Sequence, residues 1–138
     1  MEITELKFED WNQYIDLLYQ LGGYKESINM SDFKKKYKSI KEQNSFIYVI
    51  KVNDKLIATG KLFVELKIFD SLGHIEDIIV DSEYRKFGYG KIIIQYLLNE
   101  SKKMGCYKCV LDAKDELIQF YSKCGMDYVG ANFVKRFK

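Results

Sequence analysis

The sequence has 138 residues, 47% of them hydrophobic and 30% charged, an ordinary balance for one globular domain spanning residues 1–138. Its 22 basic and 20 acidic side chains leave a formal net charge of +2, which is too small to indicate a nucleic-acid partner. No apolar run could span a bilayer and no signal-peptide pattern opens the chain, so we expect a cytoplasmic protein without a membrane partner.

The first third of the chain predicts one strand and two helices. Residues 3–8 alternate apolar and polar side chains, which is typical of a strand. Asp10, followed three residues later by Gln13, resembles the N-cap of a helix that ends near Gly22. A second helix is predicted from about residue 29 to residue 42, with its lysines on a solvated face.

The middle of the chain predicts a hairpin, a third strand and a long helix. Strands over residues 46–52 and 55–68 flank an Asn-Asp turn, and residues 74–80 form the next strand. A helix over residues 91–104 follows, with two lysines in its last turn and Gly105 just beyond its end.

The last third predicts a strand over residues 106–112, a short helix and a final strand over residues 128–137. Asp115 is expected to cap the short helix, which should end at Gly125. Together, the elements predict an α/β or α+β layer fold, in which helices lie on the faces of a mixed sheet.

Cysteine and histidine are too few to indicate a metal site. The chain has three cysteines and one histidine. Cys106 and Cys109 form a Cys-x-x-Cys without a second such pair, and on a strand their side chains would point to opposite faces. We therefore expect reduced thiols and no bound metal.

The segment Arg85-Lys86-Phe87-Gly88-Tyr89-Gly90, between a predicted strand and a predicted helix, has features of an anion site. Its two glycines allow the backbone to approach a ligand closely. No side chain caps the start of the helix, so its first N–H groups are free to bind an anion such as a pyrophosphate. The Gly-Lys-Ser/Thr ending of a P-loop is missing. From these residues alone, a plain strand-to-helix turn fits equally well.

The pattern Arg85-x-x-Gly88-x-Gly90 after a strand resembles the acetyl-CoA pyrophosphate loop of the GNAT acetyltransferase superfamily, and the order of elements agrees over nearly the whole chain. Within that superfamily, blocks at residues 73–81, 105–112 and 120–125 are similar to the glucosamine 6-phosphate N-acetyltransferase family. The resemblance implies a mixed, mostly antiparallel sheet with helices on both faces, and acetyl-CoA as co-substrate without a metal.

The resemblance also implies an activity. Members of that family transfer an acetyl group from acetyl-CoA to the amine of glucosamine 6-phosphate, on the path to UDP-N-acetylglucosamine, as homodimers with shared active sites. Two alternatives stay open: a GNAT enzyme acting on a protein N-terminus, a lysine or a polyamine, and a non-catalytic acetyl-CoA-binding dimer.

The resemblance gives roles to individual residues. Tyr121 is the candidate general acid, because a phenol can donate a proton to a departing thiolate. The residues expected to contact acetyl-CoA are Ile78, Ile79, Val80, Arg85, Lys86, Phe87, Gly88, Tyr89, Gly90, Lys91 and Tyr121.

Three acids are expected in the acceptor site. Glu76 and Asp77 are adjacent in an otherwise apolar strand, so at least one should face the interior and need a partner, for which an amino sugar or an ion pair would serve. By resemblance, both bind the substrate, and Asp112 orients the amine. Asp112, Glu76 or a water chain could accept the amine proton.

A phosphate on the substrate needs cations, and the resemblance supplies three. Arg136 matches the position at which the last strand crosses to the partner subunit, and Lys108 and Lys67 match further cationic positions. Two positions depart from the family pattern: Leu117 replaces an Asn common beside the cofactor, and Gly22 replaces a Thr common in the substrate loop.

Overall fold

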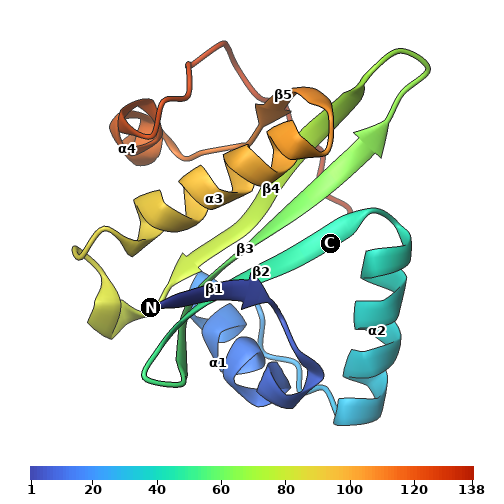
Figure 1. Cartoon of the computed structure of the whole chain (residues 1–138), viewed down its shortest axis with the longest axis vertical. Coiled ribbons are helices and arrows are strands. Elements are labelled where there is room, and N and C mark those ends of the chain that lie inside the picture. Colours follow the sequence, from blue (N-terminus) through green and yellow to red (C-terminus); the bar gives the residue numbers. More distant parts are fainter.

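The computed structural model describes all 138 residues and contains one five-stranded sheet (Figure 1). Its strands are β1 (Glu2–Glu5), β2 (Ser45–Val52), β3 (Lys55–Leu66), β4 (Ser71–Val80) and β5 (Cys106–Val110). They lie in sequence order, antiparallel to their neighbours except for β4 and β5, which run parallel. The predicted mixed, mostly antiparallel sheet is confirmed.

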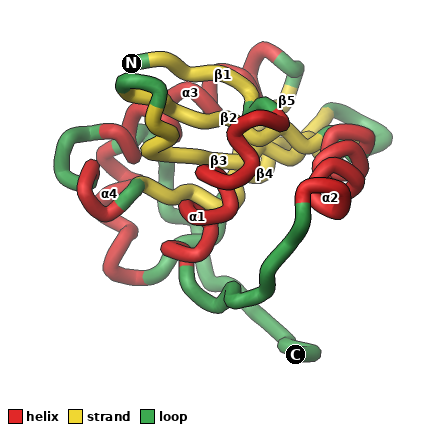
Figure 2. Tube along the Cα trace, turned by 90° about the horizontal axis from the view of Figure 1, so that it is seen from below, coloured by secondary structure: helices red, strands yellow, loops and turns green.

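Helices lie on both faces of the sheet, as predicted (Figures 1 and 2). One face carries α1 (Trp11–Leu21) and α2 (Met30–Glu42), and the other carries α3 (Tyr89–Lys103). The last helix, α4 (Ile118–Lys123), follows β5. None of the helices combines the length and apolar character that a membrane crossing requires. Short 3-10 turns are η1 (Phe8–Asp10), η2 (Ser82–Tyr84) and η3 (Asp115–Leu117).

Each face of the sheet has its own hydrophobic core. On one side, Ile93 and Leu97 of α3 are fully buried against the strands. On the other side, Leu17 of α1 and Phe33 of α2 pack with Val49 of β2. Burying a large apolar side chain contributes about 1.5–3 kcal/mol, so the two cores hold the central strands firmly in place.

Strand β4 contains a β-bulge in its second half. Thr59 of β3 pairs with Ile79, whereas Lys61 pairs with Glu76, so β4 has one extra residue in this interval. Asp77 lies within this interval and has a backbone φ of 55°, a value that residues other than glycine rarely adopt. Such a bulge bends the strand and increases its twist. Since β5 pairs only with residues 71–74, the far half of β4 has no strand on that edge.

Gly60 of β3 lies opposite the bulge and allows α3 to approach it. A Cβ at Gly60 would lie 2.6 Å from Cδ1 of Ile78 and 2.7 Å from Cδ1 of Leu97. Real Cβ atoms do not approach other heavy atoms so closely, so glycine is required for this packing.

Asp10 is the N-cap residue of α1, as predicted, but its side chain does not cap the helix, and the cap predicted at Asp115 is wrong. The Asp10 side chain makes no capping hydrogen bond; it is buried and its Oδ2 lies 2.6 Å from Nζ of Lys51. A buried carboxylate is stabilised more by a cation than by a backbone N–H, and the bond to Asp10 raises the pKa of Lys51. Asp115 likewise caps nothing, because it lies in η3 and α4 begins at Ile118.

The prediction of a final strand over residues 128–137 is also wrong. This segment contains no strand and extends away from the body on the α1/α2 side (Figure 2). A strand requires a hydrogen-bonding neighbour, and here the segment does not pair with the sheet. Its large apolar side chains are all exposed, namely Tyr128, Val129, Phe133, Val134 and Phe137.

We expect Gly60→Ala to destabilise the protein by about 1–3 kcal/mol, the usual cost of overpacking, measured as the free energy of unfolding in urea. Adding Ile78→Val removes one of the two clashing methyl groups and should recover part of that loss. A neutral Gly60→Ala substitution, or no recovery in the double variant, would contradict the packing described around the bulge.

Candidate active site

A cavity of about 560 Å³ opens at the end of β4, between the start of α3 and α4. Every residue expected to contact acetyl-CoA lines this cavity except Phe87, whose side chain is exposed on the loop surface. The lining residues are Gln20, Leu21, Ile78, Ile79, Val80, Tyr84, Arg85, Lys86, Gly88, Tyr89, Gly90, Lys91, Leu117, Phe120 and Tyr121.

The strand wall of this cavity is the half of β4 that β5 leaves unpaired. Ile79 and Val80 pair with β3 on one edge. On the other edge, β5 ends at Val110, which pairs with His74, so no strand covers the backbone of the bulged segment. Unpaired backbone N–H groups beside a cavity are available to a ligand carbonyl.

The loop between β4 and α3 presents backbone donors to the cavity. Lys86 and Gly88 both have positive φ, 71° and 87°, and Gly88 is the N-cap of α3 without a side-chain cap. The first N–H groups of this 15-residue helix are therefore free, at the positive end of its dipole. The Arg85 Nε donates a hydrogen bond of 3.1 Å to the Val80 carbonyl, which ties the loop to β4.

The end of α1 supports the same loop, a contact that sequence reasoning missed. The Gln20 side chain donates to Oδ2 of Asp81 at 3.2 Å and accepts from the Ser82 N–H at 3.0 Å. A glutamine near the end of an amphipathic helix gives no sequence signal for such a role. Leu117, which departs from the family pattern, lies at the α4 side of the cavity and offers it an apolar surface.

Tyr121 is positioned by the close packing of α4 on α3. A Cβ at Gly90 would lie 3.1 Å from Cζ of Phe120, so the small residue lets α4 approach. Phe120 in turn packs edge-on against the Tyr121 ring, with centroids 5.0 Å apart. Burial and, to a smaller extent, the Cys124 thiol raise the pKa of Tyr121 above its usual value. The phenol therefore keeps its proton at neutral pH and can donate it.

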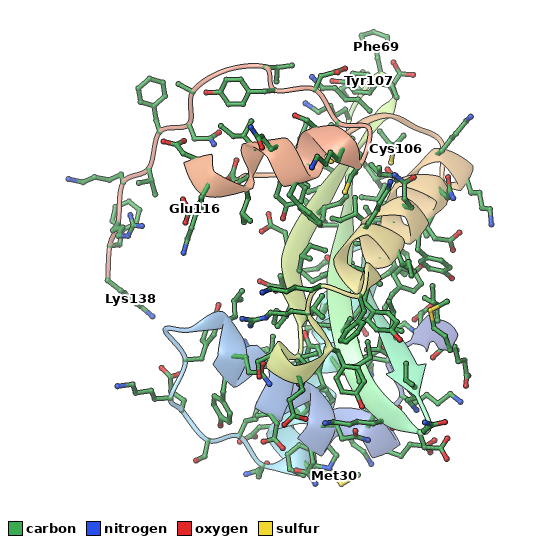
Figure 3. All side chains as sticks on the ribbon, turned by 90° about the vertical axis from the view of Figure 1, so that its left-hand side faces the viewer. Met30, Phe69, Cys106, Tyr107, Glu116 and Lys138 are labelled. Carbon is green, nitrogen blue, oxygen red and sulfur yellow. The ribbon has the colours of Figure 1, made fainter.

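A second cavity, of about 390 Å³, adjoins the first at Tyr121, which lines both. It lies between β5, α4 and the segment that follows α4. Figure 3 shows that segment passing α4 and ending at Lys138, away from the sheet. Most of the lining is apolar, including Leu98, Val110, Leu111, Ile118 and Met126.

The two adjacent acids lie on β4 but neither is buried, so the expectation of an interior acid is wrong. Glu76 is exposed, and Asp77 at the bulge is partly exposed with Oδ2 3.8 Å from Nζ of Lys61. The bulge interrupts the strict alternation of faces on which the expectation depended. The ion pair with a lysine, one of the two partners considered from sequence, is the one present.

The remaining predicted residues are exposed. Asp112 follows β5, and the Lys108 ammonium lies 5.5 Å from the centre of the Tyr107 ring. Lys67 Nζ lies 3.9 Å from Oε2 of Glu65. Arg136, on the exposed C-terminal segment, has no ion-pair partner within the chain. The structure therefore unites the loop and Tyr121 at one cavity but does not bring Arg136 to it.

Comparison with known proteins identifies the family. The model of the acetyltransferase (GNAT) family matches residues 5–126. The chain belongs to the GNAT acetyltransferase family. GNAT acetyltransferases use acetyl-CoA, and among the described side chains no group of three or more His, Cys, Asp or Glu could hold a metal ion.

Several relatives match over nearly their whole length. A glucosamine 6-phosphate N-acetyltransferase of Arabidopsis thaliana is 34% identical over 99% of this chain and 96% of its own. One of Candida albicans is 36% identical over 96% of this chain and 93% of its own. The crystal structure of the Arabidopsis enzyme superposes with a TM-score of 0.93, covering 99% of this chain and 98% of that one.

We expect Gly88→Ala to weaken coenzyme A binding about 5- to 20-fold by calorimetry, because a Cβ strains the positive φ that shapes the loop. Gly105→Ala is the matched control: its φ of 85° is similar and it also faces open space, but it lies at the opposite end of α3. Both variants should lose similar stability. Equal binding by the two variants would show that the loop is not the anion site.

Proposed function

We propose that this protein transfers the acetyl group of acetyl-CoA to the amine of glucosamine 6-phosphate, giving N-acetylglucosamine 6-phosphate and coenzyme A. The observation that carries the proposal is end-to-end similarity to enzymes of that name, at 34–36% identity, with a TM-score of 0.93 to one of them. The product is a precursor of the type required for UDP-N-acetylglucosamine.

The cavity at the end of β4 suits acetyl-CoA in its charge and shape. The loop from Arg85 to Gly90 and the first turn of α3 would hold the pyrophosphate through backbone N–H groups, with Lys86 and Lys91 adding positive charge. The apolar side chains of β4 and α4 suit the uncharged arm that carries the thioester.

The chemistry requires a neutral amine, a polarised carbonyl and a protonated leaving group. The amine nitrogen forms a bond to the thioester carbon while backbone N–H groups of the bulged β4 segment polarise its oxygen. The C–S bond then breaks, and the Tyr121 phenol gives its proton to the departing thiolate. Asp112, Glu76 or a water chain accepts the proton that the amine loses.

The acceptor is an amino sugar phosphate, with charges that the site complements. Glu76 and Asp77 lie beside the end of the cavity on β4 and suit an ammonium and sugar hydroxyls. The phosphate binds Lys67 and Lys108 of the same chain and Arg136 of a second copy.

The proposed assembly is a homodimer that exchanges C-terminal segments. The exposed apolar side chains of residues 128–137 lack a partner within one chain, and β5 is an edge strand with a free side. The apolar cavity between β5, α4 and the segment that follows α4 suits a strand from the partner once that segment has moved to the other copy. This exchange places Arg136 at the other copy's acceptor site.

The direct test mixes purified protein with acetyl-CoA and one acceptor and follows release of free thiol. The acceptors are glucosamine 6-phosphate, glucosamine and a lysine peptide. Thiol release that depends on the phosphorylated sugar is the expected result. Equal or faster thiol release with the peptide would show that the acceptor is another amine. No thiol release with any acceptor would favour a non-catalytic acetyl-CoA binder.

Tyr121→Phe should lower kcat by about 10- to 100-fold, because only the hydroxyl that protonates the thiolate is lost. The affinity for coenzyme A should change little, since the ring and its contact with Phe120 remain. Phe120→Leu is the control, because it alters packing without removing a proton donor. If Tyr121→Phe retained full kcat, another group would be the acid.

A mixture of the Arg136→Gln and Tyr121→Phe variants should regain activity when the two proteins are unfolded and refolded together. In a mixed dimer, one of the two sites receives both native residues, so random pairing restores about one quarter of the wild-type rate. Each variant refolded alone provides the baseline. Absence of recovery, with dimers present, would place Arg136 in its own chain's site or outside both sites.

A further inference from the structure

His74 has no role in the chemistry described above, although it lies within the motif shared with the sugar-phosphate acetyltransferases. Its Nε2 lies 2.8 Å from Oε1 of Glu65 on β3. Its ring stacks on that of Phe63, with centroids 5.3 Å apart and an interplanar angle of 27°. Contacts from two sides therefore fix the orientation of the only imidazole in the chain.

The imidazole lies on the same sheet face as the proposed acceptor residue Glu76. Because a Cβ at Gly73 would meet Ser101 of α3, the next side chain, that of His74, points to the opposite face. Glu76 follows two residues later, and Lys61 pairs with it across the strands. The side chain of His74 is 27% exposed, so a ligand can reach it.

One carboxylate links this imidazole to a proposed phosphate ligand. Glu65 accepts from His74 at Oε1, while its Oε2 lies 3.9 Å from Nζ of Lys67. The hydrogen bond from His74 and, secondarily, the charge of Lys67 lower the pKa of Glu65, which is therefore ionised at neutral pH. The group of three residues has no net charge when the imidazole is neutral and a charge of +1 when it is protonated.

We propose that His74 binds the phosphate of the acceptor together with Lys67, and that it does so in its protonated form. This inference rests on the proposed sugar-phosphate substrate. With a neutral imidazole, the negative charge of Glu65 offsets the positive charge of Lys67, so a phosphate dianion gains little electrostatic attraction. With an imidazolium, the group is cationic, and Nδ1, which has no partner within the protein, becomes a second N–H donor.

Binding and protonation then strengthen each other. A dianion that prefers the imidazolium raises the proton affinity of His74, and a proton on His74 raises the affinity for the dianion. Histidine is the side chain that ordinarily changes charge between about pH 5 and pH 8, so acceptor binding should weaken as pH rises through this range. The other charged groups on this part of the sheet are Lys61, Glu76, Asp77 and Lys108.

The single histidine permits a direct test by proton NMR on the untagged protein. The titration midpoint of its ring signal is measured alone, with glucosamine, with inorganic phosphate and with glucosamine 6-phosphate. We expect glucosamine 6-phosphate to raise the midpoint by about half a pH unit or more, which corresponds to about threefold tighter binding to the protonated form. Inorganic phosphate should raise it less, and glucosamine should not raise it.

The two proposals fail in different ways. An unchanged midpoint in protein that still acetylates glucosamine 6-phosphate would overturn the role of His74 and leave the proposed function intact. Failure to acetylate glucosamine 6-phosphate, with another amine accepted instead, would overturn the substrate assignment and the inference that rests on it.

The His74→Gln variant distinguishes the effect of the imidazolium charge from that of the hydrogen bond to Glu65, because an amide can still donate to Glu65 but cannot gain a proton. We expect KM for glucosamine 6-phosphate to rise about fivefold at pH 6.5 and less than twofold at pH 8.5, with kcat nearly unchanged. A KM ratio to wild type that is equal at both pH values would indicate a structural role and contradict the proposal.

Discussion

The β-bulge in β4 is the feature on which the rest of the site depends. One extra residue lies between the pairs Thr59–Ile79 and Lys61–Glu76, where Asp77 has a positive φ, and it falls in the half of β4 that β5 leaves unpaired. A parallel pair that continued to Val80 would fill the space that the cavity occupies. The energetic cost of the bulge is offset by the two cores, which hold β3 and β4 from both faces, and by Gly60, which lets α3 pack against the distorted strand.

The bulge, the loop and α4 converge at the cavity from three parts of the sequence. The anion site proposed for the loop depends on backbone geometry at Gly88 and on the uncapped start of α3. Tyr121 reaches the cavity because Gly90 allows Phe120 and hence α4 to approach α3. In the proposed site, coenzyme recognition therefore depends mainly on the backbone, whereas acceptor recognition depends on charged side chains on an exposed sheet face. Such side chains can change without disturbing the fold.

Local patterns in the sequence were sufficient to predict most of the fold, and the misses have physical causes. The bounds of α3 agree with the predicted helix to within two residues, because its apolar periodicity indicates a helix and Gly105 marks the end of it. Asp10 stands at the predicted N-cap position, but no local pattern reveals that its carboxylate pairs with a distant cation, Lys51, instead of capping the helix. The strand expected at residues 128–137 has a suitable pattern, but strand formation depends on a neighbour that one chain lacks. At the site, the glycine-rich motif located the cavity, whereas the Glu65–His74 pair and Gln20 depend on contacts between distant segments.

The central claim is that the end of β4 that β5 leaves unpaired and the loop before α3 form the coenzyme site. A crystal structure of the protein with coenzyme A tests it most directly. The account predicts the pyrophosphate against the N–H groups of the Arg85–Gly90 loop, and the thiol arm between β4 and α4, ending near the Tyr121 hydroxyl. Coenzyme bound elsewhere, or β5 paired with β4 through to Val80 in the complex, would contradict it.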